Sequence, residues 1–380
     1  MFEYPTINGG ENSLLAMAEQ LSQLGVQFQA AGPPTGPLAD RLQQQGIPIL
    51  PLDLIDAAGS RHELGECRRR IDALLANASY DVVHSNSLSM SRIVGPVVRQ
   101  RDVPSLGHIR DIVNISRRAT TDVDLNCRVL SVSEATREHH CRAGLTPEKT
   151  FVLYNGVDLD KFQPRPPSFV LHRELGIPDT CPIVVSIGQV VLRKGLDTLL
   201  SAAFDVAAHF AAHFAAPQAR TGDCQPHFVH VGARYSVKQE AIEHELELRR
   251  LSESDELSGR FHFLGARSDV RQILADSTLL VHTAKQEPLG RVLLEAAACG
   301  LPIIATAVGG TCEILPTAES GAVVPVNEPA AVAREIVELL EDRTRRESMG
   351  AAARIVAEQN FDVRMRASEL LGHYKAVANI

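Results

Sequence analysis

Short apolar runs alternate with amphipathic stretches along the whole sequence. In the first part of the chain, runs rich in apolar and β-branched residues predict strands at residues 26–32, 47–53, 80–86, 103–109, 128–133 and 150–156. In the second part, the same rhythm predicts strands at residues 181–188, 227–232, 260–265, 277–284, 302–306 and 321–325. Helix-like segments lie between these runs, and such alternation is typical of parallel sheets that carry helices on both faces.

Two sets of strands indicate two domains, so the expected fold class is α/β, with two Rossmann-like, doubly wound domains. A chain of 380 residues is also too long for one ordinary core. Three prolines between Phe162 and Ser168 mark a linker. We expect an N-terminal domain over residues 1–160, a C-terminal domain over residues 161–360, and a helical tail over residues 361–380.

The composition is that of a globular protein. Hydrophobic residues make up 44% of the sequence and charged residues 22%, which is ordinary for a soluble domain. The net charge of −8 and the absence of tryptophan argue against a nucleic-acid-binding protein. No run approaches about 18 apolar residues, so no membrane-spanning helix is expected. A peripheral membrane contact is permitted by the composition but not indicated by it.

The seven cysteines form a scattered set without a C-x-x-C pair. This usage suits a reducing compartment and offers no zinc site. The N-terminal segment lacks the basic start and apolar core of a signal peptide, so the expected location is the cytoplasm. Only eight residues precede Gly9, which leaves a short first strand of about five residues. This shortness suggests that the recorded start lies downstream of the true one.

Several common catalytic signatures are missing from the sequence, including the phosphate-binding G-x-x-x-x-G-K-[ST] loop, G-x-G-x-x-G, G-x-S-x-G and H-E-x-x-H. His209 and His213 have a spacing that can hold a metal ion, but no third ligand is evident. Two Asp-x-Asp pairs, at 122–124 and 158–160, match a metal–diphosphate motif in spacing only, and we interpret both as structural. We therefore expect no metal site and no cofactor.

Four groups of residues could carry chemistry. The first is Gly9–Gly10, which is expected to follow the first strand and precede a helix, where bare backbone N–H groups can cradle an anion. The second consists of His108, Arg110 and Asp111, just past the end of a predicted strand. A structural role for the lone histidine is the alternative at this position.

The third group is the pair Arg193–Lys194, which is expected to open the helix after the first strand of the second domain. Two cations at a helix N-terminus oppose the helix dipole unless an anion joins them. The fourth group is Glu287 and Gly290 followed by Glu295, with Pro288 suited to the first turn of a helix. Its carboxylates could accept hydrogen bonds from hydroxyl groups, and an ordinary amphipathic helix with an acidic first turn is the alternative.

Six motifs follow one another along nearly the whole chain: GGE (9–11), VSEAT (132–136), YNGVDLDKFQP (154–164), IGQVVLRKG (187–195), FLGARSDV (263–270) and EPLGRVLLEAAACGLPIIATAVGG (287–310). Together they resemble the retaining glycosyltransferases of family 4, the "group 1" type, and the last contains an E-x7-E spacing. The resemblance implies the GT-B fold, in which two Rossmann-like domains face each other across a cleft. It also implies that the C-terminal helix, about 361–380, packs back on the first domain.

The resemblance assigns a role to each candidate position. It implies catalytic roles for His108, Arg193, Lys194 and Glu287. It implies donor binding by Gly9, Gly10, Gly188, Gly265, Arg267, Leu289, Gly290, Arg291 and Glu295.

Within this set, Glu287 and the backbone N–H groups of Leu289 and Gly290 would hold sugar hydroxyls, and Glu295 would take the ribose hydroxyls. The Arg193–Lys194 pair would hold the diphosphate, helped by the amides of the first glycine pair. Backbone near residues 265–267 would meet the base, and the histidine of the first domain would face the transferred sugar.

The implied activity is transfer of a hexose from a UDP- or GDP-sugar to a hydroxyl acceptor, with retention of configuration and without a metal ion. The stabilisation of a departing diphosphate is the main chemical requirement. One departure from the family pattern is Gln189, where many relatives carry an arginine. Two alternatives remain: a nucleotide-sugar epimerase on the same fold, and a non-catalytic relative that binds sugar nucleotides.

Overall fold

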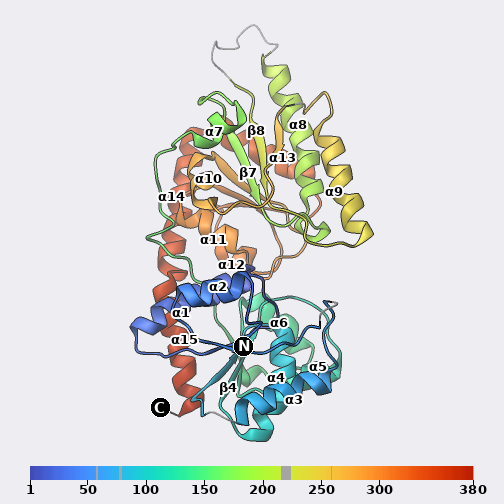
Figure 1. Ribbon diagram of the computed structural model, residues 1–380. Helices are drawn as coiled ribbons and strands as arrows, with labels where there is room; N and C mark the ends of the chain where they lie inside the picture. The colour runs from blue at the N-terminus through green and yellow to red at the C-terminus, as the bar shows by residue number, and fades with distance from the viewer. Residues whose placement is uncertain (57–58, 77–78, 215–223, 258, 380) are drawn as a thin grey trace. The chain divides into compact units, whose positions relative to one another are not determined.

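The computed structural model describes residues 1–56, 59–76, 79–214, 224–257 and 259–379 (Figure 1). It divides into two compact units: unit 1 comprises Met1–Asp158 with Phe361–Ile380, and unit 2 comprises Leu159–Asn360. The described residues contain twelve strands, and each lies inside one of the predicted segments. All strand pairs of the sheets are parallel, which confirms the expected α/β class.

Unit 2 is built on one continuous sheet. Its strands are β7 (Ile183–Ile187), β8 (His227–Val231), β9 (Phe261–Phe263), β10 (Leu279–His282), β11 (Ile303–Thr306) and β12 (Ala322–Val324). Their order across the sheet is β12-β11-β10-β7-β8-β9. The chain therefore winds outwards first in one direction and then in the other, and the reversal falls between β7 and β10.

Helices cover both faces of this sheet. They are α7 (Val170–Leu175), α8 (Leu196–Phe214), α9 (Gln239–Ser252), α10 (Val270–Asp276), α11 (Arg291–Ala298), α12 (Thr311–Ile314), α13 (Pro329–Glu341) and α14 (Arg343–Asn360). α8, α9 and α13 lie on one face, and α7, α10, α11 and α14 lie on the other (Figure 1). Val184, Phe228 and Ile336 belong to the buried core on the first of these faces. Burial of both faces explains why the strands are continuous apolar runs.

The described strands of unit 1 form two sheets, whereas one doubly wound sheet was expected. Its strands are β1 (Ala30–Gly32), β2 (Ile49–Pro51), β3 (Val83–Ser85), β4 (Ser105–Ile109), β5 (Arg128–Ser131) and β6 (Thr150–Val152). β1 and β2 form one sheet, and β3 to β6 form a second sheet in chain order. The expected first strand ahead of Gly9 is not formed by the described residues, so that prediction is wrong.

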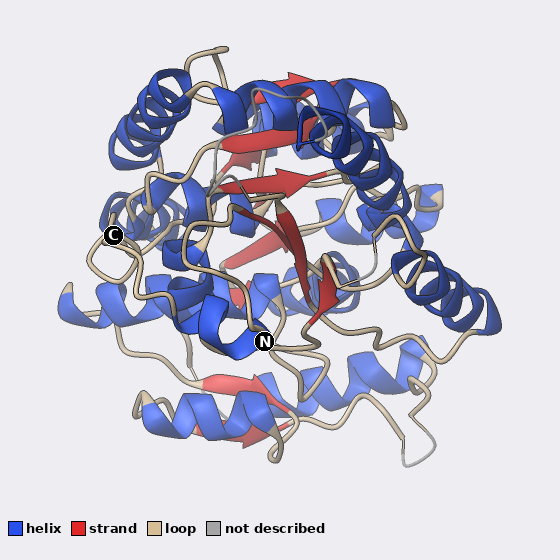
Figure 2. Cartoon of the chain, turned by 90° about the horizontal axis from the view of Figure 1, so that it is seen from above, coloured by secondary structure: helices blue, strands red, loops and turns tan. Residues whose placement is uncertain are grey.

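Helices of unit 1 pack around these sheets. Figure 2 distinguishes the helices of the chain, in blue, from its strands, in red. They are α1 (Gly9–Gln23), α2 (Pro37–Gln44), α3 (Leu64–Ala76), α4 (Leu88–Arg101), α5 (Arg117–Asp124), α6 (Glu134–Arg142) and α15 (Val363–Ala378). None of the helices formed by the described residues of the chain combines the length and the apolar character needed to cross a membrane.

Backbone contacts join the start of the C-terminal helix α15 to the segment that follows β6. The Val157 amide donates to the Phe361 carbonyl at 2.7 Å, and the Val363 amide donates to the Val157 carbonyl at 3.0 Å. A Cβ atom at Gly156 would lie 2.5 Å from the Val363 Cα, so only glycine allows this approach. α15 then packs against α1.

Cys181 and Cys224 form a disulfide in unit 2, 43 residues apart in sequence. Cys67, Cys127, Cys141, Cys299 and Cys312 are free thiols. A ring nitrogen of His227 and the two bonded sulfur atoms lie within 4.8 Å of one another. The scattered spacing of the cysteines gave no indication of this pairing, and a disulfide differs from the free thiols expected in a reducing compartment.

Opening this disulfide is expected to lower the free energy of unfolding by about 3–4 kcal/mol, because the bond closes a long loop in the unfolded chain. Urea unfolding of Cys181→Ser measures the loss, and Cys312→Ser, an exposed free thiol, is the matched control. In denaturant, thiol titration should find five groups before reduction and seven after it. Seven reactive thiols without a reductant would show that the pair is open in the protein.

Candidate active site

The candidate active site of unit 2 lies where the strand order reverses. β7 pairs with β10 in parallel register, Val184 opposite Leu279 and Val185 opposite Leu280. The carboxyl ends of these strands therefore meet at one edge of the sheet, and the connections that follow them leave in opposite directions. Ligands of open α/β sheets bind at such a switch point. The two loops that leave it carry Lys194 and Glu287.

The loop after β7 contains a 3-10 turn, Leu192–Lys194, and then Gly195 in the left-handed conformation at φ 63°. α8 begins only at Leu196. The prediction that Arg193 and Lys194 open this helix is therefore wrong, because Gly195 separates their turn from the helix. The dipole of α8 therefore gives no argument that Arg193 and Lys194 bind an anion.

Gly195 also fastens the loop after β7 to the loop after β10. A Cβ atom here would lie 1.9 Å from the Thr283 carbonyl oxygen. The Thr283 hydroxyl donates to the Gly195 carbonyl at 2.8 Å, and the Lys285 amide donates to the Arg193 carbonyl at 2.8 Å. These contacts fix the backbone of Arg193 while its side chain remains exposed.

Glu287 lies at the centre of a buried polar cluster. Its side chain forms an ion pair with the Lys194 ammonium and is 2.8 Å from His282 Nε2. Only 7% of Glu287 is exposed. Burial alone would raise the pKa of this carboxyl, but the charge of Lys194 and the hydrogen bond with His282 outweigh it and hold the pKa well below its usual range. Burial lowers the pKa of His282, so the ring is neutral at physiological pH.

Gly290 turns the chain from Glu287 into α11. Its φ of 99° is unfavourable for other residues, and a Cβ atom would lie 2.8 Å from Leu293 Cδ1. α11 begins at Arg291, so the prediction that Pro288 occupies the first turn of this helix is wrong. Leu289 is buried, with 1% of its surface exposed, and its side chain anchors the turn.

Glu295 lies one turn into α11 and is 7% exposed. Arg291 Nη2 is 2.7 Å from its carboxylate, in an i,i+4 ion pair. The two predicted donor-binding residues therefore contact each other. The Arg291 side chain keeps Glu295 paired although the carboxylate is largely removed from water.

Three glycines crowd the carboxyl ends of β7, β8 and β9. The Gly188 amide donates to the Val231 carbonyl at 2.9 Å, and the Gly232 amide donates to the Gly265 carbonyl at 2.8 Å. A Cβ atom at Gly232 would lie 1.7 Å from the Gly188 carbonyl oxygen. The predicted positions Gly188 and Gly265 are thus brought together by a glycine that the sequence patterns did not single out.

Arg267 follows this edge of the sheet but is engaged with two carboxylates. Its guanidinium contacts Asp269 at 2.7 Å and Glu174 at 2.6 Å. The hydrogen bonds to Asp269 and Glu174 raise its pKa, so its charge is permanent. The expected contact of this segment with a nucleotide base stays a prediction, and the described geometry leaves that task to backbone groups.

The predicted residues of unit 1 lie around α1 and β4. Gly9 and Gly10 form the first turn of α1, where the Asn8 amide donates to the Glu11 carboxylate at 2.9 Å. A Cβ atom at Gly10 would lie 2.7 Å from Arg110 Cδ. The absence of a side chain at Gly10 thus makes room for the arginine beside the helix start.

His108 is completely buried in β4. Its Nδ1 is 3.1 Å from Arg110 Nη2 and 3.3 Å from His84 Nε2, and the two histidine rings stack 5.4 Å apart. No hydrogen-bond partner of His108 Nε2 occurs among the described residues. Burial lowers the pKa of His108. Its predicted contact with a sugar would require the ring to become accessible.

Sequence patterns missed His282 because it lies at the end of a buried strand, where it was counted as part of the apolar run. The distance of five residues from His282 to Glu287 was the available signal. The interpretation of the first Asp-x-Asp pair as structural fits the ion pair of Asp122 with Arg68 at 2.7 Å. His209 is 2.8 Å from Glu341, and the side chain of His213 lies outside the described residues.

Lys194→Met is expected to lower the free energy of unfolding by about 3 kcal/mol, because it leaves the buried Glu287 carboxylate without its cation. Glu287→Gln in the same chain should restore part of this loss. The contribution of Glu287 is present above the pKa of an unfolded glutamate, about 4.3, and fades as the pH falls towards the lower folded value. Urea unfolding at pH 7 and pH 4 measures the free energy of unfolding of the two single variants and the double variant. If the losses of the single variants simply add in the double variant, Lys194 and Glu287 are not coupled.

Comparison with known proteins identifies the family of the chain. A profile described as "Glycosyltransferase Family 4" matches residues 7–161, and one described as "Glycosyl transferases group 1" matches residues 168–356. The GDP-mannose-dependent alpha-mannosyltransferase of Mycobacterium tuberculosis is 27% identical, over 98% of this chain and 94% of its own length. D-inositol 3-phosphate glycosyltransferase 1 of Catenulispora acidiphila is 27% identical, over 91% of this chain and 85% of its own length.

Solved structures show the fold. The crystal structure of Anabaena HepE in complex with UDP has a TM-score of 0.81 at 22% identity, over 98% of each chain. Sucrose-phosphate synthase from Thermosynechococcus elongatus has a TM-score of 0.78 at 20% identity, over 97% of this chain and 94% of its own. The two parallel α/β units therefore have the GT-B fold, and the chain belongs to the group 1 glycosyltransferases of family 4.

Proposed function

We propose that this glycosyltransferase binds a UDP- or GDP-hexose at the switch point of unit 2 and transfers the hexose to a hydroxyl acceptor with retention of configuration. The observation that supports this best is the buried cluster of Lys194, His282 and Glu287 at the ends of β7 and β10. It combines a fixed ionised acceptor with a cation at the place where open α/β sheets bind ligands. Unit 1 is then the acceptor-binding domain.

Glu287 is suited to hold hydroxyl groups of the donor sugar. An ionised carboxylate only accepts hydrogen bonds, and this one is held ionised by Lys194 and His282. The backbone N–H groups of Leu289 and Gly290 lie at the turn that follows and complete the set of sugar contacts. Glu295, further along α11, accepts the ribose hydroxyls, with Arg291 beside it.

The departing group is a nucleoside diphosphate, so the reaction needs positive charge where negative charge develops. Lys194 and the exposed Arg193 supply it from one turn of the chain. No metal ion is then required for charge stabilisation. In unit 1, the amides of Gly9 and Gly10 would assist in holding the diphosphate, and the ring of His108 would face the transferred sugar.

The proposed site does not by itself select the nucleotide base or the acceptor. Of the similar proteins, one is named as GDP-mannose-dependent and one is solved with UDP. The proposed donor therefore carries either UDP or GDP. The cytoplasm remains the expected location, since five of the seven cysteines are free.

An epimerase on the same fold and a non-catalytic relative are the competing functions. Gln189 favours the non-catalytic relative, because a neutral amide replaces one phosphate-binding cation. The paired Lys194 and Glu287 favour the enzyme, because they keep the charges that transfer requires. Slow hydrolysis of a donor sugar without acceptor distinguishes the enzyme from a binding protein, and a change of sugar configuration without release of nucleotide identifies an epimerase.

The direct test measures binding of UDP, GDP and ADP by calorimetry and then hydrolysis of the matching donor sugars. We expect one of UDP and GDP to bind more tightly than ADP, and its hexose to be released slowly with EDTA present. Loss of all hydrolysis in EDTA, restored by Mg²⁺, would contradict metal independence. Release of the sugar in the opposite anomeric form would contradict retention.

Glu295→Ala is expected to weaken nucleotide binding by about 1.5–3 kcal/mol, the range for hydrogen bonds to a charged group. Calorimetry with the preferred nucleotide measures the change. Glu347→Ala is the matched control, because it removes an exposed carboxylate of the same unit that is paired with an arginine. Equal affinity of the folded Glu295→Ala variant and the control would remove the ribose assignment.

Arg193→Ala is expected to lower turnover by about 10²–10³, the cost of removing one donor from a charged transition state. Arg193 would supply the charge that Gln189 lacks, because a guanidinium offers a charged, two-pronged contact to phosphate. Gln189→Arg added to Arg193→Ala should restore part of the turnover. Turnover within about threefold of wild type, roughly 0.7 kcal/mol, would assign the charge to Lys194 alone.

A further inference from the structure

Two cysteines and a histidine meet at one edge of the sheet of unit 2. Cys181 lies just ahead of β7, and Cys224 lies just ahead of β8, which begins at His227. The two strands pair in parallel with Ile183 opposite His227, and the His227 amide donates to the Pro182 carbonyl at 2.9 Å. This register brings the segments ahead of both strands side by side, so the Cα atoms of Cys181 and Cys224 are 5.0 Å apart.

The three side chains are the right distance apart for metal ligands. The two sulfur atoms and a ring nitrogen of His227 all lie within 4.8 Å of one another, and no other group of three or more His, Cys, Asp or Glu side chains among the described residues does so. Zinc binds sulfur at about 2.3 Å and nitrogen at about 2.0–2.1 Å, so ligand atoms of one tetrahedral site are about 3.5–3.8 Å apart. Small movements of the side chains would therefore let the group surround one zinc ion once the disulfide is open.

The ring of His227 is held in place by a second histidine. Its Nδ1 is 3.1 Å from His262 Nε2, and the two rings stack with their centroids 5.4 Å apart. A histidine that binds a metal ion almost always has such a partner, which fixes the orientation and the tautomer of its ring. The stacked pair thus provides the support that a metal-binding histidine needs.

Two buried polar atoms close to the cysteines lack a hydrogen-bond partner among the described residues. One is Gln225 Oε1, which follows Cys224 in the chain. The other is Nδ1 of the buried His172, whose Nε2 is 3.1 Å from the Cys181 carbonyl oxygen. Buried polar atoms are rarely left unpaired. A zinc ion with three protein ligands keeps a water molecule in its fourth position, and such a water molecule can donate to acceptors of this kind.

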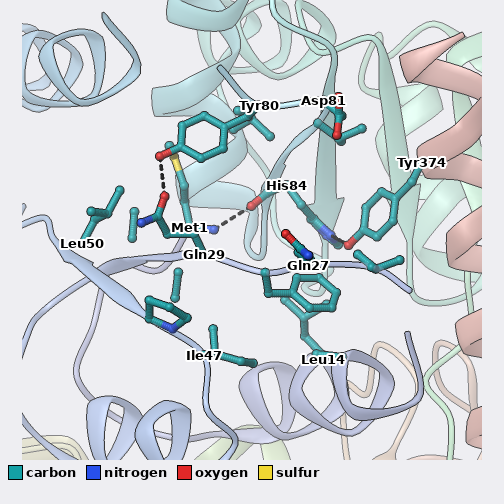
Figure 3. Close-up of a pocket in the computed structure, with 18 of the residues that line it drawn as sticks. Met1, Leu14, Gln27, Gln29, Ile47, Leu50, Tyr80, Asp81, His84 and Tyr374 are labelled. Atoms are coloured by element: carbon teal, nitrogen blue, oxygen red, sulfur yellow. Dashed lines mark hydrogen bonds between the residues drawn. The ribbon is translucent and has the colours of Figure 1, made fainter. Parts of the chain in front are cut away.

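Histidines elsewhere in the described chain have different neighbours. In unit 1, His84 contacts Tyr374 at 2.7 Å, and it also contacts His108; Figure 3 shows His84 and Tyr374. In unit 2, His282 contacts the Glu287 carboxylate at 2.8 Å. These contacts provide nitrogen and oxygen atoms, whereas thiolate ligands are the ones that favour zinc over harder cations such as Mg²⁺. The donor set at the start of β7 and β8 is therefore the one that suits zinc.

We propose that Cys181, Cys224 and His227 form a zinc site when the disulfide is open. In a reducing compartment, a dithiol opens the bond by passing two electrons and two protons to the cysteine pair, and the dithiol itself becomes a disulfide. Zn²⁺ then displaces the two thiol protons and binds both thiolates together with the neutral ring of His227. The closed disulfide and the zinc-bound dithiolate are two alternative links between the starts of β7 and β8.

This site differs from the absence of a zinc site that the cysteine spacing predicted. That prediction searched for ligands close together in sequence, whereas Cys181 and Cys224 are 43 residues apart and meet through the pairing of β7 with β8. Both cysteines precede their strands, while Lys194 and Glu287 follow strands of the same sheet. The five residues of β7 separate these two edges by about 16 Å. The zinc ion therefore takes no part in the proposed transfer, and the zinc site does not depend on the function proposed above.

Zinc binding by the whole chain in its two redox forms tests the site. A water-soluble phosphine reduces the disulfide, taking up an oxygen atom from water to become a phosphine oxide, and the excess is removed in the absence of oxygen. Competition with a chromogenic chelator then measures the affinity for Zn²⁺. We expect the reduced chain to bind one Zn²⁺, at least about 100-fold more tightly than the oxidised chain, because only the reduced chain offers thiolates.

Substitutions of the ligands are expected to affect the reduced chain. Cys181→Ser, Cys224→Ser and His227→Ala should each weaken zinc binding by more than about 100-fold, because each removes a ligand. His262→Phe removes only the supporting contact and should weaken binding by about 10–100-fold. Cys312→Ser is the matched control, because it removes an exposed free thiol of the same unit, and it should bind Zn²⁺ as the wild type does.

Cobalt identifies the ligands without relying on affinity. Co²⁺ bound in place of Zn²⁺ should give the visible absorption of a tetrahedral site and a near-ultraviolet charge-transfer band from thiolate to metal. At saturating Co²⁺, the intensity of this band should fall to about half in Cys181→Ser, which keeps one of the two thiolates.

Equal zinc affinity of the reduced and oxidised chains overturns the proposal, and so does wild-type affinity of Cys181→Ser or of His227→Ala. A cobalt complex without the thiolate band, or a disulfide that stays closed in excess phosphine, also overturns it. If reduction unfolds the chain, refolding from urea is compared with Zn²⁺ and with Mg²⁺. Recovery of the fold with Zn²⁺ alone supports the site, and equal outcomes with the two ions contradict it.

Discussion

The parallel pairing of β7 with β10 is the constraint on which the candidate donor site depends. The register of Val185 with Leu280 brings the ends of both strands to one edge. Because the strand order runs outwards on both sides of this pair, the loops diverge and leave room at the edge. Lys194 and Glu287, 93 residues apart in sequence, meet there. The contacts at Gly195 and Thr283 only secure what the sheet has already positioned.

Charge balance explains why the cluster is stable without a ligand. A buried carboxylate alone would be costly, but Glu287 has both Lys194 and His282. If the proposed diphosphate contact forms, the diphosphate shares Lys194 with Glu287. One cation between two anions would leave neither of them unpaired, so the proposed donor would bind without exposing a buried charge. A second cation, Arg193, stays free of that constraint because its side chain is exposed.

The strands were predictable because each is an apolar run bounded by turn residues. The carboxylates Glu287 and Glu295 were visible because both lie on one short segment. The sequence did not predict the 3-10 turn at Arg193, which depends on the conformation of a single glycine. Nor did it predict the Cys181–Cys224 bond, since a separation of 43 residues carries no local signal. His282 was missed because a strand pattern does not distinguish a functional histidine from a core residue.

The two units differ in how firmly their candidate residues are positioned. The donor cluster stands at the edge of a continuous six-stranded sheet, so its geometry follows from a complete set of strand contacts. His108 belongs to a separate four-stranded sheet of unit 1, and it contacts the edge strand of that sheet, β3, through His84. Because His108 is completely buried, its predicted contact with a sugar requires the ring to become accessible, whereas Lys194 and Glu287 already lie at the edge of their sheet.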